Sequence, residues 1–188
     1  MNFYVIGHRG VRTNKDCYIC NKNQKFPENS LTAFSKCIEF GGDGIEFDVR
    51  LSKDKKLIIY HDEYICANLS YSNNSYVKID DLKYDDLEKF YSNKSSQITT
   101  LSQALEFIAY RTSEQDDNLI VNIDLKTCNL SNNVVFILNK FINRKKINIE
   151  NIIINSFYWD ELAKINASKP AIKICPNIKS GVIWQDNI

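Results

Sequence analysis

The sequence predicts an α/β fold, namely a TIM-type (β/α) barrel that is incomplete, with about six of its eight strands present. Short β-prone runs alternate with amphipathic helical segments, and this order is typical of βα units in a mostly parallel sheet. Ionisable and amide side chains also fall near the carboxyl ends of five predicted strands, the edge where barrel enzymes hold their active sites. The 188 residues correspond in length to one domain, with an insertion around residues 62–98.

The first half of the chain predicts three strands and a helix, with a short extended connection between the second and third strands. Residues 3–6 are β-prone, and Asn29 or Ser30 then caps a helix that ends at a pair of glycines. Residues 44–50 alternate strictly between apolar and polar side chains, which indicates a strand with two different faces. The strand over residues 57–61 follows too soon for a helical crossover, so we expect an extended return.

The second half continues the alternation of strands and helices. It follows an Asn-, Ser- and Tyr-rich insertion in which residues 85–91 predict a short helix. Apolar side chains then recur with helical spacing in some segments and with a period of two in others. The predicted helices cover residues 102–111, 134–143 and 159–165, and the predicted strands cover residues 119–126, 152–155 and 171–175.

Composition and charge exclude several classes of protein. Hydrophobic residues make up 44% and charged residues 25% of the chain, which is typical of a soluble globular protein. A net charge of +1 offers no global attraction to nucleic acid, and the apolar runs are too short to span a bilayer. The amino terminus lacks the pattern of a signal peptide, so we expect a cytoplasmic protein with no stable membrane insertion. The oligomeric state stays open.

Three carboxylates form a candidate metal site. Glu46 and Asp48 lie two residues apart on one face of a predicted strand, about 7 Å from each other at roughly 3.3 Å per residue. Like charges this close repel unless a proton or a divalent cation lies between them. With Asp124 from another strand, three oxygen ligands suit Mg²⁺ or Ca²⁺, which could polarise a phosphoryl oxygen.

Two histidines and two cationic side chains lie beside these carboxylates in the predicted topology. His8 and His61 are the only histidines of the chain, and one can take a proton from a nucleophile while the other protonates a leaving group. Arg9 can contact phosphate oxygens with its planar guanidinium, and Lys126 adds a second positive charge. A cation, two proton carriers and two positive side chains predict phosphodiester cleavage.

Each motif also has a simpler interpretation. Residues 44–50 could form a strand whose polar side faces water, and His61-Asp62 could be an ordinary turn. Cys17 and Cys20 form a lone Cys-x-x-Cys motif without the second pair that zinc sites need, so we interpret them as an incidental pair in a loop. The functional hypothesis depends on the combination of motifs.

That combination resembles the glycerophosphodiester phosphodiesterases. The motifs that carry the resemblance are, in order, His8-Arg9-Gly10, Pro27-Glu28-Asn29-Ser30, Glu46-x-Asp48-Val49 and His61-Asp62. The resemblance continues more weakly through residues 100–101, 122–126 and 155–157, and it covers about the first three-quarters of the family's barrel.

The resemblance implies a metal-dependent phosphoric diester hydrolase that releases glycerol 3-phosphate and an alcohol such as choline or ethanolamine. In such an enzyme His8 and His61 are the acid/base pair, Arg9 contacts phosphate, and Glu46 and Asp48 bind the metal. A glycerol hydroxyl attacks phosphorus, and water then opens the cyclic phosphate. The implied partner is a small glycerophosphodiester in lipid metabolism.

Departures from the family pattern keep two alternatives open. The third metal ligand of the family is usually Glu, whereas this chain has Asp124. The residues that usually follow the His-Asp motif in the family are replaced here by a different stretch after His61-Asp62. A non-catalytic, truncated barrel that binds a phosphorylated ligand or partner is one alternative. A sphingomyelinase D-like phospholipase, which also uses two histidines and an acidic metal site, is the other.

Overall fold

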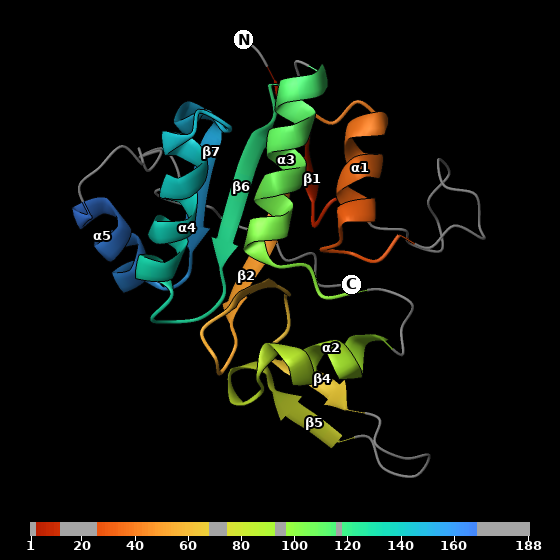
Figure 1. Cartoon of the computed structure of the whole chain (residues 1–188), viewed down its shortest axis with the longest axis vertical. Coiled ribbons are helices and arrows are strands. Elements are labelled where there is room, and N and C mark those ends of the chain that lie inside the picture. Colours follow the sequence, from red (N-terminus) through yellow and green to blue (C-terminus); the bar gives the residue numbers. More distant parts are fainter. Residues whose placement is uncertain (1–2, 12–25, 68–74, 93–96, 116–117, 169–188) are drawn as a thin grey trace.

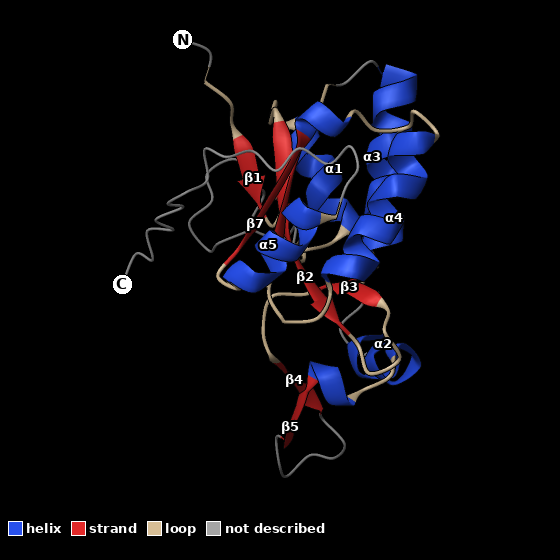
Figure 2. Ribbon diagram, turned by 90° about the vertical axis from the view of Figure 1, so that its left-hand side faces the viewer, coloured by secondary structure: helices blue, strands red, loops and turns tan. Residues whose placement is uncertain are grey.

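A parallel sheet with helices packed on one face forms the body of the protein (Figures 1 and 2). The computed structural model describes residues 3–11, 26–67, 75–92, 97–115 and 118–168. The strands of the sheet are β1 (Ile6–His8), β2 (Gly44–Leu51), β3 (Leu57–Ile59), β6 (Ile120–Leu125) and β7 (Ile152–Ser156). The order β1-β2-β6-β7 is parallel throughout, while β3 pairs with β2 in the antiparallel sense.

The α/β prediction is therefore confirmed, and the sheet is consistent with an incomplete barrel. The helices around the sheet are α1 (Leu31–Glu39), α3 (Leu101–Gln115), α4 (Ser131–Asn143) and α5 (Trp159–Ala167), with the one-turn helix η2 (Ile149–Asn151) before β7. Each predicted helix is present, within a few residues of its expected bounds. The predicted strand over residues 171–175 and the Cys17–Cys20 pair lie outside the described residues.

The core lies between the sheet and the helices, and the alternation of β2 explains why. Ile45, Phe47 and Val49 are fully buried and join the apolar side chains of β6, β7 and the helices in one cluster. Successive side chains of a strand point to opposite faces. The polar residues of β2 consequently face away from the helices. The sheet thus carries an apolar face under the helices and a polar face on the opposite side.

The first strand begins later than the sequence predicts. We expected residues 3–6, but β1 covers Ile6–His8, and Phe3, Tyr4 and Val5 are exposed. The register explains the difference, because Ile6 pairs with Gly44 at the very start of β2. Among the described residues, no strand therefore lies beside residues 3–5.

The predicted return after β2 is an antiparallel hairpin. Residues Val49 and Ile59 are partners in the β2–β3 register, and the Tyr60 N–H donates to the carbonyl of Asp48 at 3.0 Å. This pairing brings His61, the next residue, back beside the carboxylates of β2. No helical crossover is needed.

Within residues 62–98, the described residues 62–67, 75–92 and 97–98 form a small unit at the carboxyl end of β2 (Figures 1 and 2). Its elements are β4 (Tyr64–Ala67), β5 (Ser75–Lys78), the one-turn helix η1 (Ile79–Asp81) and α2 (Tyr84–Ser92). A separate apolar cluster holds it together and includes Ile65, Ile79 and Leu87. None of the helices that the structure describes is both long enough and apolar enough to cross a membrane.

Candidate active site

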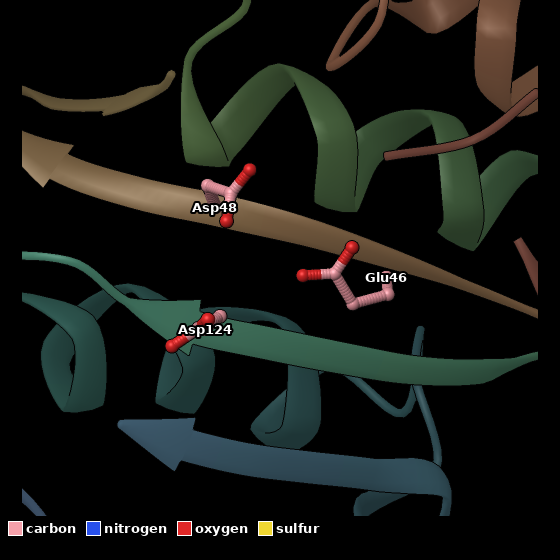
Figure 3. A group of neighbouring side chains, drawn as sticks. All are labelled: Glu46, Asp48 and Asp124. Carbon is pink, nitrogen blue, oxygen red and sulfur yellow. The ribbon is translucent and has the colours of Figure 1, made fainter. Parts of the chain in front are cut away.

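The strand register brings the three predicted carboxylates together. Glu46 and Asp48 lie on β2, Asp124 lies on the adjacent strand β6, and Asp48 and Asp124 are direct partners in the parallel pairing. Figure 3 shows the three side chains pointing into the same space. One oxygen of each carboxylate lies within 4.8 Å of the others. This separation allows a single ion to contact all three residues.

The carboxylates are buried, which excludes the interpretation of β2 as a half-solvated strand. Glu46 is 8%, Asp48 0% and Asp124 2% exposed. Burial, with the charge of Asp48 as a second cause, raises the pKa of Glu46 to about 7, and burial also raises the pKa of Asp124. Without a cation, Glu46 therefore takes up a proton at a much higher pH than an exposed glutamate does.

The residues fit a hard divalent cation. In the part of the chain that is described, Asp124 Oδ1 is buried without a hydrogen-bond donor, and Asp48 Oδ1 is buried with the Lys126 ammonium group 3.2 Å away. Buried carboxylate oxygens without donors are costly, and an oxygen-ligated ion such as Mg²⁺ or Ca²⁺ satisfies them.

Lys126 lies against the same carboxylates. Its Nζ is 3.2 Å from Asp48 Oδ1 and 2.5 Å from Asp124 Oδ2. Burial lowers the pKa of Lys126, but the bonds and charges of Asp124 and Asp48 outweigh that effect, so the pKa is raised. Lys126 thus stays positively charged at the edge of the carboxylate cluster.

Arg9 is held over the carboxylates by a strained turn after β1. Its backbone has a φ of 57°, which is the left-handed region that few residues other than glycine adopt. The Arg9 N–H donates to Glu46 at 2.8 Å, Nη1 donates to Glu28 at 2.9 Å, and Nε lies 3.1 Å from Asp48 Oδ2. The next residue, Gly10, has a φ of 80°, and a Cβ there would lie 2.7 Å from the backbone of Ala33. The turn requires glycine at that position.

Asn29 holds Asp48 in place, and sequence reasoning missed this role. Its Nδ2 donates to Asp48 Oδ2 at 2.8 Å, and its Oδ1 accepts from the Asp48 N–H at 3.3 Å. Asn29 also has a φ of 57° and is buried. The sequence indicates a helix start there, and the helix cap is in fact Ser30. The feature of the sequence that could have indicated this role of Asn29 is the Pro27-Glu28-Asn29-Ser30 motif.

The two histidines lie at the open side of the site. His8 Nε2 is 3.9 Å from Glu46 Oε2. Burial, followed by the charge of Arg9, lowers the pKa of His8, so its imidazole is neutral at pH 7. His61 Nδ1 lies 2.7 Å from Asp62 Oδ1, and His61 is close enough to affect the pKa of both His8 and Asp124.

Arg50 fixes the backbone of His61. Its Nε donates to the His61 carbonyl at 2.8 Å, and Arg50 itself is only 9% exposed. Sequence reasoning did not select Arg50 either. The alternation of β2 could have identified Arg50 as a site residue, because residues 46, 48 and 50 share one face of the strand.

The structure thus brings all seven predicted site residues to one edge of the sheet. Two amides join them, because Asn122 is the register partner of Glu46 and Asn155 is the register partner of Asp124. The side-chain oxygens of both amides are buried without a hydrogen-bond donor among the described residues. They add acceptors for a bound water or hydroxyl group.

Comparison with known proteins places this arrangement in a family. A model of the glycerophosphoryl diester phosphodiesterase family matches residues 8–186. A glycerophosphodiester phosphodiesterase of Caldanaerobacter subterraneus subsp. tengcongensis is 31% identical over 98% of the chain, and one of Bacillus altitudinis is 27% identical over 98%. The crystal structure of a glycerophosphodiester phosphodiesterase from Thermotoga maritima matches 90% of the chain with a TM-score of 0.59 and 29% identity.

The chain is shorter than these relatives. It spans 68% of the Caldanaerobacter protein, 67% of the Bacillus protein and 61% of the Thermotoga structure. The match extends over nearly all of the present chain, from the first histidine onward. The chain belongs to the glycerophosphoryl diester phosphodiesterase family.

Proposed function

We propose that the protein hydrolyses glycerophosphodiesters to glycerol 3-phosphate and an alcohol, with a divalent cation and two histidines. The observation that carries the proposal is the buried cluster of Glu46, Asp48 and Asp124 beside His8 and His61. The family membership agrees with it. Three buried carboxylates face two cationic side chains, Arg9 and Lys126, so a negative charge is left over that a divalent cation would offset.

Glu46, Asp48 and Asp124 would hold the cation. When bound, Mg²⁺ or Ca²⁺ polarises a phosphoryl oxygen and offsets the charge that develops at phosphorus. Asp124 Oδ1, which no described donor contacts, is a free ligand atom, and one oxygen of each of the three carboxylates lies within reach of a single ion. Asn29 and Arg9 keep Asp48 oriented, since both contact its second oxygen.

His8 and His61 would divide the proton transfers. His8 is neutral at pH 7 because its pKa is lowered, so it can accept the proton of the glycerol 2-hydroxyl group. The hydroxyl oxygen then bonds to phosphorus, and the bond from phosphorus to the alcohol breaks. His61, whose Nδ1 is held by Asp62, gives the departing alcohol its proton. Water opens the resulting cyclic phosphate with the two proton transfers reversed.

Arg9 and Lys126 would contact the phosphate group. Both side chains are mostly buried and both already border the carboxylates, so a phosphate placed between them would lie next to the cation site. The planar guanidinium favours a bidentate contact, whereas the ammonium acts as a point charge.

The test is release of glycerol 3-phosphate from glycerophosphocholine and glycerophosphoethanolamine by the whole chain, with Mg²⁺ or Ca²⁺ and with EDTA. Glu46→Gln removes one ligand charge, and Glu39→Gln is the matched control, because Glu39 is an exposed glutamate paired with Lys36. We expect EDTA and the Glu46→Gln substitution each to abolish the release of glycerol 3-phosphate. The Glu39→Gln variant should release it at the wild-type rate. A folded protein that releases no product would contradict the proposal and favour a non-catalytic, phosphate-binding barrel.

A further inference from the structure

A cavity opens beside the candidate active site, between the end of β7 and the start of α4. Its volume is about 410 Å³, which is within the range of small-molecule sites. The lining residues are Cys128, Asn129, Phe157, Tyr158, Trp159, Asp160, Glu161 and Lys164. Helix α5 and the two residues before it supply most of this lining, and in Figure 1 α5 lies beside α4 at one side of the sheet. The proposed mechanism uses none of these residues.

The cavity adjoins the proposed phosphate position through one aromatic ring. The Nζ of Lys126 lies 5.9 Å from the centre of the Phe157 ring, and the same Nζ contacts Asp48 and Asp124. Phe157 therefore lines the cavity and also borders the site. A phosphate that contacts Lys126 would therefore lie close to this cavity, which has room for the alcohol group of the substrate.

The lining is aromatic and acidic rather than aliphatic. Phe157, Tyr158 and Trp159 are exposed by 64%, 42% and 73%, and the cavity contains no Leu, Ile, Val or Met. Exposed aromatic faces attract cations, and quaternary ammonium groups are a frequent ligand of such surfaces. An acyl chain would instead favour aliphatic side chains.

The charges around the cavity also favour a cation. Lys164 is neutralised by Glu161, whose carboxylate lies 2.7 Å from its ammonium group. Asp160 is exposed and takes part in no ion pair that the structure describes. Asp160 also acts on the charge of Lys164, and Asp160, Glu161 and Lys164 together carry a formal net charge of −1 beside the cavity.

From these features we propose that the cavity binds the trimethylammonium group of choline and so makes glycerophosphocholine the preferred substrate. This inference rests on the proposed function, because it places the alcohol half of the same substrate. Trp159, the first residue of α5, is the main specificity-determining residue, since it is the most exposed of the three rings.

The kinetic test compares substrates that differ only in the alcohol. Trp159→Ala should lower kcat/KM for glycerophosphocholine about tenfold through a higher KM, as expected for a lost cation–π contact, and Trp159→Phe should restore most of it. The value for glycerophosphoethanolamine should change less than about twofold, because its ammonium group is small and well hydrated. The inference is wrong if Trp159→Ala lowers kcat/KM equally for both substrates. It is also wrong if the substitution lowers kcat/KM only for lysophosphatidylcholine, tested as a third substrate.

A binding measurement separates this inference from the proposed function. The chain has two tryptophans, Trp159 and Trp184. Choline chloride should quench the fluorescence saturably in the wild-type protein and in Trp184→Phe, but not in Trp159→Phe, and ethanolamine at equal ionic strength should not quench. Saturable quenching without turnover of any substrate would support the cavity and contradict the proposed function. If choline does not quench the fluorescence specifically, the inference that the cavity binds choline is wrong, whether or not the protein turns over a substrate.

Discussion

Glu46 and Glu161 are both buried glutamates, yet their surroundings shift the pKa in opposite directions. Glu46 faces Asp48 and Asp124 and accepts one backbone N–H, and its pKa rises to about 7. Glu161 accepts the N–H groups of Leu130 and Ser131 at the start of α4 and the ammonium group of Lys164. Although burial raises the pKa of Glu161, these donors lower it to about 2.

The difference separates a structural carboxylate from the one that we propose to bind the cation. Glu161 is satisfied by the protein itself and connects α5 to α4, so its charge stabilises the fold. Glu46 lacks sufficient donors, and its charge becomes favourable only when a ligand supplies the missing positive charge. A buried carboxylate therefore indicates a binding site when its neighbours leave it unsatisfied.

The largest expected effect concerns the proton transfers at the unsatisfied site. His8→Ala and His61→Ala should each lower turnover of a glycerophosphodiester by about 10²–10⁴-fold. Both side chains are partly exposed, so the melting temperature should be unchanged. The measurement pairs steady-state kinetics with thermal unfolding. Turnover within a factor of three of wild type for either variant would remove that histidine from the mechanism.

A smaller effect is expected where the protein positions a ligand of the unsatisfied site. Asn29→Ala removes both hydrogen bonds to Asp48, and loss of such supporting contacts typically weakens metal affinity by about 10–100-fold. Calorimetric titration with Ca²⁺ and Mg²⁺ measures this effect, and Ser35→Ala on an exposed face of α1 serves as the control. An unchanged affinity would show that Asp48 needs no such support.

Glu161→Gln tests the satisfied carboxylate. Loss of the charge that accepts two backbone N–H groups and binds Lys164 should lower the free energy of unfolding by about 2 kcal/mol. Denaturant unfolding measures the change, with Asp160→Asn as the matched control, because that neighbouring carboxylate is exposed. Turnover of saturating glycerophosphoethanolamine, whose alcohol does not depend on the proposed choline cavity, should stay the same per folded molecule. A loss of activity without a loss of stability would contradict the structural role that we assign to Glu161.

The same glutamate predicts a pH dependence. The pKa of Glu161 lies at about 2 in the folded chain and at its ordinary value of 4.5 when unfolded, so its contribution is complete above about pH 5. It is lost as the pH falls from about 4.5 toward 2. The difference in unfolding free energy between wild type and Glu161→Gln should therefore be smaller at pH 3 than at pH 7. A difference that is constant across this range would contradict the lowered pKa.

Much of this arrangement could be predicted from the sequence, because strand periodicity is local and the carboxyl ends of parallel strands meet at one edge of the sheet. The alternation of β2 separates Glu46 and Asp48 from the core, and the same alternation in β6 identifies Asp124. Asn29 could not be assigned in this way, since its role depends on a left-handed turn that brings it against β2. Glu161 could not be assigned either, because it caps a helix that begins 30 residues earlier in the chain.

The most direct test of the central claim is calorimetric titration of the metal-free chain with Ca²⁺ and Mg²⁺ at pH 7.5. The comparison is among wild type, Glu46→Gln and Glu161→Gln. We predict saturable binding to the wild-type chain, an affinity at least about tenfold weaker in Glu46→Gln, and wild-type affinity in Glu161→Gln. Equal affinities for wild type and Glu46→Gln would contradict the assignment of the carboxylate cluster as the cation site.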